Sequence, residues 1–232
     1  MTGGSVETLI QKQLAQYHLF REQLADTRAE GGPRHAPVIT ISRMTGCCAR
    51  SVSEILAARL DLQVWKPDLI DLVAKDHQLM REVASVLDGE TLGRIDSEVE
   101  AMVKHRRCRD DDPIQNLVRV VKILAETGGV VIHGRGGALI MGDKADLRLR
   151  LVAGEQHRLR TVMERRQVPE RKAGILMRAG DSRRATFVRL ALFSDIDNAR
   201  HYDLILNTDR STPEEVVDMA VCWLELKGHK ID

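Results

Sequence analysis

The stretch ITISRMTGCCARS, residues 39–51, combines a β-branched run, a loop of small residues and the start of an amphipathic segment. The run Val38–Ile41 has the composition of a buried strand, and apolar residues recur on one face of Ser51–Leu60, as in a helix. Strand, loop and helix in this order form the unit from which helix-covered parallel sheets are built. The stretch therefore predicts an α/β fold with a candidate binding loop after its first strand.

The rest of the chain continues this alternation. The predicted strands are Leu62–Trp65, Gly129–His133, Leu147–Val152 and Asp203–Asn207. The predicted helices are Asp68–Ala74, Leu79–Val103, Ile114–Thr127, Glu155–Arg166, Asp181–Phe193 and a last helix from Pro213 through 226–228. We therefore expect a three-layer fold, a parallel sheet covered on both faces, with function at the carboxyl ends of the strands.

Two segments qualify that pattern. Arg148 and Arg150 alternate with apolar residues in their strand, which indicates one face less buried than a central strand's. Gln167–Gly180 holds Pro169, two glycines and three basic residues, which is typical of a mobile basic flap. We expect this flap to act as a lid.

The region before the first strand divides in two. Apolar residues at spacings of three, four and seven predict an amphipathic helix within residues 1–28, and Gly and Pro mark residues 29–37 as a linker. Packing of the helix on its own domain is favoured, and a homodimer or protein partner through it is the alternative. The main domain is expected over 38–232.

Composition excludes several function classes. The chain has 232 residues, with 35 Lys and Arg against 34 Asp and Glu, so no global field attracts nucleic acid or a membrane. The basic cluster Lys104–Arg109 keeps nucleic-acid binding as a minor alternative, although aromatics are only 3%. Glu7 and Lys12 interrupt the N-terminal segment, and no apolar run is long enough for a bilayer. We expect a cytoplasmic protein without nucleic-acid or membrane partners.

The loop is comparable with G-x-x-x-x-G-K, in which backbone N–H groups and a lysine hold phosphates. Arg43 stands at the first glycine, Cys48 at the second and Ala49 at the lysine, so the strict motif fails. The features that remain are Gly46 in the loop, Arg50 beside the lysine position and Ser51 where a metal-binding hydroxyl would lie. A plain turn between strand and helix is the alternative.

Two further segments could hold an anion. In His133–Gly137 (HGRGG), glycines allow close backbone approach and arginine recognises phosphate through its fork. Arg165 and Arg166 precede the segment 178–184 (RAGDSRR), in which Asp181 and Arg184 are three residues apart. The second set indicates an arginine lid over transferring phosphates, with an intrahelical ion pair as its alternative.

Together these motifs resemble the cytidylate kinase-like family, within the P-loop nucleoside monophosphate kinases. They occur in the family's order over Val38 to about Leu226. The matching features are ITISR-x-x-G, the acidic segment Lys66–Ile70, HGRGG, D-x-x-R and YDLILNT. The resemblance implies a P-loop kinase fold with a monophosphate-binding insertion, about 66–112, and a lid, about 166–184.

The resemblance also implies an activity and its residues. ATP, with Mg²⁺, would donate its γ-phosphate to a small nucleotide acceptor. Donor binding is implied for Arg43, Met44, Thr45, Gly46, Cys47, Cys48, Ala49, Arg50 and Ser51, with Ser51 as the magnesium contact. Asp68 and Arg135 would face the acceptor, and Arg178, Asp181 and Arg184 would act from the lid.

The chain departs from the family pattern at two places, and it shares with many members the lack of the loop lysine. Members usually have G-S-G-G where it has Gly46–Ala49 (GCCA), so a position that needs positive φ would be strained by about 1–2 kcal/mol. Gly136 replaces an aspartate of cytidylate kinases proper, so cytosine specificity does not follow. With the loop lysine lost, Arg43 or Arg50 would supply the charge. A catalytically impaired nucleotide-binding or regulatory protein on the same fold is therefore the alternative function.

The four cysteines, at 47, 48, 108 and 222, have no zinc-site spacing, and the histidines offer no metal-ligand pattern. Cys47 and Cys48 lie at a helix N-terminus, where exposed thiols would have lowered pKa values. Inert small residues are the simpler interpretation, and redox control of the loop is the alternative.

Overall fold

The computed structural model describes residues 11–12, 14–19, 22, 36–104 and 112–231. The chain divides into two compact units: Met1–Ala36 with Trp65–Gly129, and Pro37–Val64 with Val130–Asp232. The predicted insertion, about 66–112, falls in the first unit. The loop, the glycine turn and the lid segment all belong to the second.

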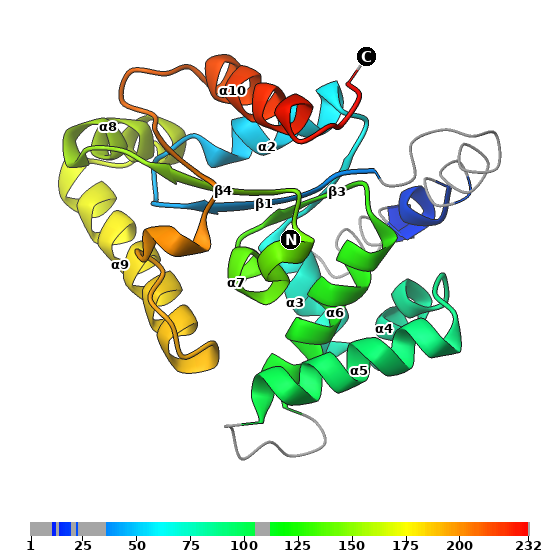
Figure 1. Cartoon of the computed structure of the whole chain (residues 1–232). Helices are drawn as coiled ribbons and strands as arrows, with labels where there is room; N and C mark the ends of the chain where they lie inside the picture. The colour runs from blue at the N-terminus through cyan, green and yellow to red at the C-terminus, as the bar shows by residue number, and fades with distance from the viewer. Residues whose placement is uncertain (1–10, 13, 20–21, 23–35, 105–111, 232) are drawn as a thin grey trace. The chain divides into compact units, whose positions relative to one another are not determined.

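The fold class is confirmed by a five-stranded sheet in the order β2-β3-β1-β4-β5 (Figure 1). Its strands are β1 (Val38–Arg43), β2 (Gln63–Trp65), β3 (Val130–His133), β4 (Leu147–Val152) and β5 (Leu204–Asn207). β1 pairs in parallel with β3 and β4, and β4 pairs in parallel with β5. Parallel pairing brings the carboxyl ends of these strands to one edge of the sheet. The loops that follow β1, β3 and β4 therefore share that edge.

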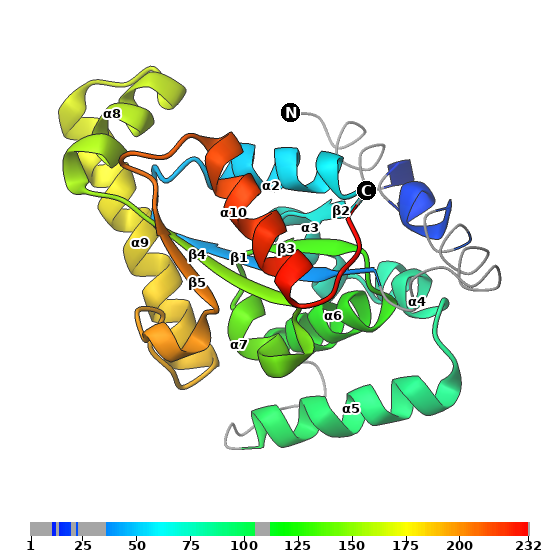
Figure 2. The same cartoon turned by 45° about the horizontal axis from the view of Figure 1, so that its top comes forward.

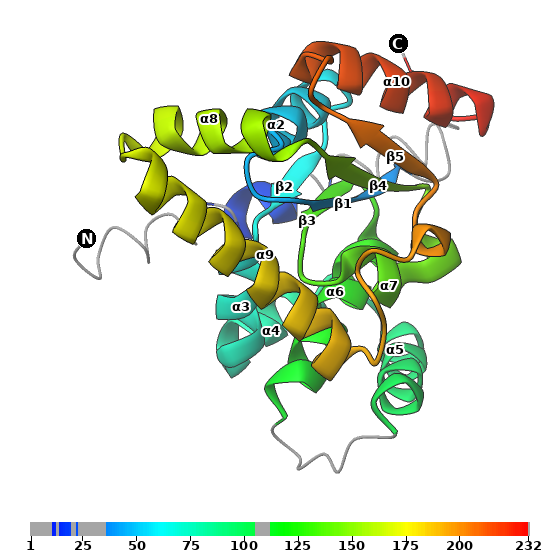
Figure 3. The same ribbon diagram turned by 90° about the vertical axis from the view of Figure 1, so that its left-hand side faces the viewer.

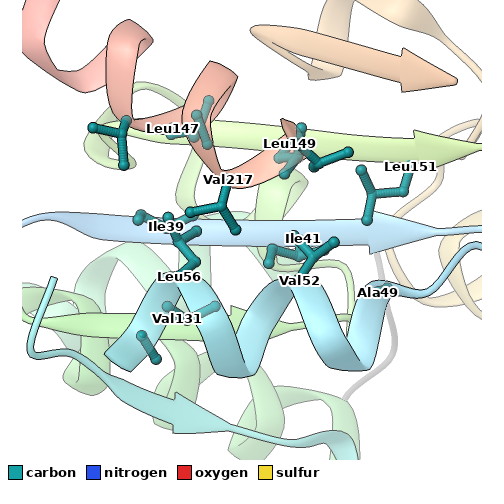
Figure 4. Packing of buried hydrophobic residues seen from close by; sticks show 14 of the residues in the cluster. Ile39, Ile41, Ala49, Val52, Leu56, Val131, Leu147, Leu149, Leu151 and Val217 are labelled. Carbon is teal, nitrogen blue, oxygen red and sulfur yellow. The ribbon is translucent and has the colours of Figure 1, made fainter. Parts of the chain in front are cut away.

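The core of the second unit lies between the sheet and two helices, α2 (Ala49–Arg59) and α10 (Pro213–Leu226), which cover one face (Figures 1 and 2). Figure 4 shows Ile39 and Ile41 of β1 packed against Val52 and Leu56 of α2 and Val217 of α10. All five are at most 1% exposed. Burial of such a side chain contributes about 1.5–3 kcal/mol, so this layer fixes α2 and the loop before it.

The opposite face of β1 packs against α7 (Gly137–Met141), a short helix that the sequence did not predict. An ideal Cβ on Gly137 would lie 3.0 Å from Ile132 and 3.4 Å from Thr40. This close approach requires a small residue where α7 begins. The glycines of the HGRGG segment thus serve packing as well as turning.

A pair of contacting helices, α8 (Glu155–Arg166) and α9 (Glu170–Ala191), follows β4 (Figure 3). The bounds of α8 agree with the prediction, but the expected flap over Gln167–Gly180 is wrong. The chain turns at 167–169 and then forms one helix of 22 residues. Gly174 and Gly180 lie inside this helix and are buried, and at Gly180 the small residue allows a close approach of Thr45.

β4 also corrects the sequence interpretation. Arg150 is only 4% exposed, although alternating arginines predicted a face less buried than a central strand's. It lies second from the edge of the sheet and pairs with Asp197. A buried arginine is tolerated when it is paired, so an alternating charge does not by itself indicate a solvated face.

The first unit is helical. Its helices are α3 (Pro67–Lys75), α4 (His77–Ala84), α5 (Gly89–Val103) and α6 (Pro113–Thr127). The single helix predicted over Leu79–Val103 is wrong, because the chain breaks between α4 and α5. Asp88 caps α5 by accepting hydrogen bonds from the Thr91 N–H at 2.7 Å and hydroxyl at 3.0 Å.

Most of the predicted N-terminal helix lies outside the described residues. Among those described, Tyr17 is 1% exposed and meets Trp65 edge to face at a centroid distance of 5.6 Å. Its hydroxyl donates to the Val83 carbonyl at 3.4 Å. Tyr17 thus packs against residues of its own unit, and a homodimer or protein partner through the helix stays a prediction. In the described part of the chain, no helix is both long and apolar enough to cross a membrane.

Candidate functional site

The loop between β1 and α2, Met44–Cys48, passes through the left-handed region twice. Gly46 has a φ of 93° and Cys48 a φ of 47°. A Cβ in this region costs about 1–2 kcal/mol, so Cys48 meets the condition for strain at a position where the family has glycine. The Cys48 carbonyl accepts from the Val52 N–H at 3.1 Å, which starts α2. The N–H groups and positive dipole end of α2 thus lie at the loop.

Two glycines let the neighbouring helices approach this loop closely. An ideal Cβ on Gly46 would lie 2.6 Å from the Arg158 carbonyl oxygen of α8. One on Gly180 of α9 would lie 2.6 Å from the Thr45 hydroxyl oxygen. Both distances are too short for a side chain. Gly46 and Gly180 therefore place the loop against α8 and α9.

A charged network joins the loop to both helices. Asp181 accepts from the Thr45 N–H at 2.8 Å and from the Thr45 hydroxyl at 2.9 Å. Arg158 and Arg184 form ion pairs with the same carboxylate, and Arg184 also donates to the Thr45 hydroxyl. The structure thus brings the predicted lid residues Asp181 and Arg184 to the predicted loop. Arg158 completes the network and was missed, because its helix contains several other basic residues.

Burial and ion pairing shift the pKa values of the network residues in opposite directions. Burial would raise the pKa of Asp181, but the Thr45 N–H, the Arg158 guanidinium and the Thr45 hydroxyl together lower it below its ordinary value. Burial lowers the pKa of Arg184 in spite of Asp181, and the charges of Arg150 and Arg183 lower it further. Partly desolvated cations therefore gather around one carboxylate, an arrangement that favours a further anion.

A second contact reaches the first turn of α2. Arg165, in the last turn of α8, donates from Nη2 to the Ser51 hydroxyl at 2.9 Å. Arg50, beside the missing lysine, pairs instead with Glu54 one turn along α2, at 3.1 Å. Sequence reasoning grouped Arg165 with the lid but did not single it out. Its contact spans 114 residues, which no local pattern shows.

The turn between β3 and α7 has three consecutive residues with positive φ: 82° at Gly134, 51° at Arg135 and 68° at Gly136. An ideal Cβ on Gly134 would lie 2.3 Å from Nη1 of Arg43, so the predicted donor residue Arg43 extends across this turn. A Cβ on Gly136 would lie 2.3 Å from Leu192. Leu192 therefore fills the space that an aspartate at Gly136 would need.

Arg150 forms a third cluster at the end of the sheet. It donates to the Ser42 hydroxyl at 2.9 Å, pairs with Asp197 and lies 5.4 Å from the Tyr202 ring centroid. Tyr202 donates to the Ile196 carbonyl at 2.7 Å. Ser42 and Arg150 are register partners of β1 and β4, which explains their contact. These residues were not predicted as a group, because they join only through the sheet register.

The two loop cysteines differ in environment. Cys47 is 1% exposed, and burial raises its pKa to about 11, although the Thr208 hydroxyl acts to lower it. The expectation of a lowered pKa depended on exposure and is not met at Cys47. Cys48 is half-buried. The inert interpretation therefore fits Cys47.

Three predicted residues are not among those that form this network. Arg178 is exposed on α9, with its guanidinium back along the helix near Gly174. Asp68 is exposed in the first turn of α3 and belongs to the first unit, whereas Arg135 belongs to the second. The roles assigned to these three side chains stay predictions.

A magnesium ion is implied by the resemblance, and Ser51 is its predicted contact. Among the described residues, no group of three or more His, Cys, Asp or Glu is placed to hold a metal ion. The Ser51 oxygen accepts from a guanidinium, and a metal at the same oxygen would bring two cations together. Ser51 in this arrangement does not fit a protein-held Mg²⁺, so we derive no step through one.

The fold and this site can now be compared with known proteins. The model of the cytidylate kinase-like family matches residues 38–210. The chain belongs to the cytidylate kinase-like family. The match covers the loop, the glycine turn and the lid residues, and it confirms the resemblance drawn from the motifs. A search of curated proteins finds no match.

The fold of this family member is similar to that of solved structures to different degrees. An uncharacterized protein from Eubacterium ventriosum has a TM-score of 0.66 at 22% identity, covering 82% of this chain and 98% of that chain. Shikimate kinase from Bacteroides thetaiotaomicron has a TM-score of 0.44 at 13% identity, covering 81% and 97%. Gluconokinase from Sinorhizobium meliloti has 0.44 at 14% identity, covering 84% and 99%. The first similarity supports the fold, and we draw no argument from the other two.

Proposed function

We propose that this protein transfers the γ-phosphate of ATP to a nucleoside monophosphate or a related small acceptor. The carrying observation is the network that joins Thr45 of the loop to Asp181 and Arg184 of α9, with Arg158 of α8. It unites a loop at a helix N-terminus with the lid residues of a kinase family. In the reaction, the bond from the ADP oxygen to the γ-phosphorus breaks as an acceptor oxygen bonds to that phosphorus.

The donor would bind at Met44–Cys48 and the start of α2. Gly46 and Cys48 in left-handed conformations turn the loop around the helix axis, and the helix dipole favours anionic oxygens there. ATP is the donor class that this geometry and the family support. Mg²⁺ in such sites is held largely by phosphate oxygens and water, so it would arrive with the nucleotide.

The arginines of α8 and α9 would stabilise the transferring group. Phosphoryl transfer depends mainly on positioning and on charge stabilisation by groups fixed beforehand. Arg158 and Arg184 have side chains only 9% and 23% exposed, and Asp181 holds both in place. They need little reorganisation when an anion arrives. We assign Arg184 to the transferring phosphate and Asp181 to positioning.

The acceptor side supports a nucleotide class without naming a base. Arg135, beside Gly134 and Gly136, offers a guanidinium for an acceptor phosphate. Leu192 occupies the space next to Gly136, so no carboxylate at that position is available to a sugar. The acceptor role of Asp68 stays a prediction, and we assign no preference for cytosine.

The test is ADP release from ATP and Mg²⁺ by the purified protein with a panel of nucleoside monophosphates. Arg184→Ala serves as the loss control, after its melting temperature has been compared with that of the wild type. Turnover that requires an acceptor and falls at least a hundredfold in Arg184→Ala supports the kinase. Silence across the panel by a folded protein contradicts it.

A second function is favoured by two observations. Cys48 imposes strain where the family has glycine, and the Asp181 carboxylate already accepts from the Thr45 N–H. A protein that binds nucleotide through this loop without transferring phosphate would tolerate both features. Saturable ATP binding by calorimetry together with no turnover would support this regulatory alternative, whereas acceptor-dependent turnover would exclude it.

A further inference from the structure

We propose that Arg165 supplies the positive charge that a lysine provides in a G-x-x-x-x-G-K loop, and so binds the donor phosphates. The inference rests on the proposed function and names a binding residue for it. Ala49 occupies the lysine position at the first residue of α2, and Ser51 lies two residues further on. Arg165 Nη2 is 2.9 Å from the Ser51 hydroxyl. A cation from another helix thus stands at the turn of α2 whose lysine position holds alanine.

The geometry of α8 explains how this charge is held in place. Arg158, Val162 and Arg165 are four and then three residues apart, so they share one face of the helix. Arg158 is fixed by Asp181, and Val162 is 6% exposed. The backbone at Arg158 also packs against Gly46 of the loop. The helix is therefore positioned by its first half, and Arg165 extends from its last turn to α2.

The two arginines that the sequence offered as substitutes face elsewhere. Arg50 is paired with Glu54 on the outside of α2. Arg43 extends across the β3–α7 turn, where its Nη1 approaches Gly134. Among the residues that the structure describes, Ser51 is the hydrogen-bond partner of Arg165. A guanidinium has five N–H donors, so this contact leaves donors for phosphate oxygens.

The Ser51 contact also has a purely structural interpretation, in which Arg165 only braces α2 against α8. The two interpretations predict different effects of Arg165 on the affinity for a triphosphate. A brace contributes to unfolding free energy and not selectively to phosphate affinity. An arginine that binds phosphate contributes to triphosphate affinity. A lysine placed in the loop should therefore restore the affinity that is lost when Arg165 is removed.

The experiment compares Arg165→Ala with Arg160→Ala, an exposed arginine on the same helix that takes no part in the site. Binding of ATP and of inorganic tripolyphosphate is measured by calorimetry, with and without Mg²⁺, and melting temperatures are recorded for each variant. We expect about ten- to one-hundredfold weaker binding of both probes in Arg165→Ala, as for the loss of a charge-assisted hydrogen bond. Arg160→Ala should bind within about twofold of the wild type. Adding Ala49→Lys to Arg165→Ala should restore at least part of the affinity.

Each outcome decides between the interpretations. Equal affinities in Arg165→Ala and Arg160→Ala overturn the inference, whether or not the melting temperature falls. If the wild type binds tripolyphosphate but not ATP, the proposed function is contradicted, and the comparison of the arginine variants with tripolyphosphate still tests Arg165. If the wild type binds neither probe, both the proposed function and the role of Arg165 are overturned. If Ala49→Lys melts early because position 49 is buried, the comparison of the two arginine variants is sufficient.

Discussion

The loop Met44–Cys48 and the β3–α7 turn, Gly134–Gly136, lie at the same edge of the sheet and are held in different ways. Each places one residue with a Cβ in the left-handed region, Cys48 at 47° and Arg135 at 51°. The loop is fixed by a charged network, with Asp181 accepting from Thr45. The turn has Leu192 packed against Gly136.

The comparison separates two reasons for glycine at such positions. Gly46 and Gly136 have positive φ and neighbours within 2.6 Å and 2.3 Å of an ideal Cβ. Cys48 and Arg135 share the conformation but accommodate a side chain. Backbone strain alone costs about 1–2 kcal/mol, and a clash with backbone atoms, as at Gly46, adds a steric cost that a flexible side chain such as Leu192 can partly relieve. The family's glycine at position 48 was therefore replaceable, and Gly46 was not.

Gly46→Ala should have the largest effect, because the new Cβ would meet the Arg158 backbone and adopt a φ of 93°. Strain and overpacking together predict a loss of about 2–5 kcal/mol in unfolding free energy. Chemical denaturation measures this loss. Gly89→Ala is the matched control, since no atom lies within 4 Å of its ideal Cβ, and it should be neutral or slightly stabilising. Equal effects in the two variants would refute the steric argument.

Asp181→Asn tests whether charge holds the loop. We expect a loss of about 2–3 kcal/mol at pH 7, because Arg158 and Arg184 lose their charged partner. The pKa of Asp181 is lowered in the folded protein, so its contribution is present above its unfolded pKa of about 3.9 and is lost as pH falls through the folded value.

The gap in unfolding free energy between wild type and Asp181→Asn should therefore shrink as the pH falls below about 4. Urea denaturation from pH 7 to pH 3 measures it. A gap that stays constant over this range would show that shape rather than charge explains the loss. Leu192→Ala, which changes the apolar contact at Gly136, serves as the control. Its difference in unfolding free energy from the wild type should not shrink as the pH falls.

Gly136→Asp restores the aspartate of cytidylate kinases at the turn. We expect a loss of about 1–3 kcal/mol, because the new side chain would take a φ of 68° and its Cβ would lie 2.3 Å from the flexible end of Leu192, which can shift in part. Leu192→Ala in the same chain should recover some of this loss, and a double-mutant cycle measures the coupling. Additive effects would mean that the Leu192 side chain is not the reason why position 136 requires glycine.

The sequence predicted most of the fold because its signals were local. Leu147–Val152 and Glu155–Arg166 have the bounds expected from composition and periodicity. The errors arose where one residue type has two uses. Gly180 was taken as a sign of flexibility, but it sits in α9 because Thr45 lies against it. A single sequence does not show which atoms will face a glycine.

The site was predicted in part for the same reason. The loop, Asp181 and Arg184 belong to short motifs that can be recognised in the sequence without a structure. Arg158 and Arg165 required knowledge of which face of α8 meets the loop, and their contacts with Asp181 and Ser51 span 23 and 114 residues. Helical periodicity places the two arginines on one face, but it does not say what that face meets.

Cys48→Gly should have the smallest effect, and it isolates the strain at the loop. Glycine removes about 1–2 kcal/mol of left-handed strain but adds about 0.5–1 kcal/mol of backbone entropy in the unfolded chain, so the net gain should lie between about 0 and 1.5 kcal/mol. Cys48→Ala keeps the Cβ and removes the thiol, and it should therefore leave the unfolding free energy unchanged. Paired urea denaturations measure both variants. Stabilisation by alanine equal to that by glycine would show that the thiol, and not the backbone, is the source of the cost. A gain confined to glycine would establish that the left-handed backbone at position 48 has a measurable cost, because only glycine takes a positive φ without a Cβ.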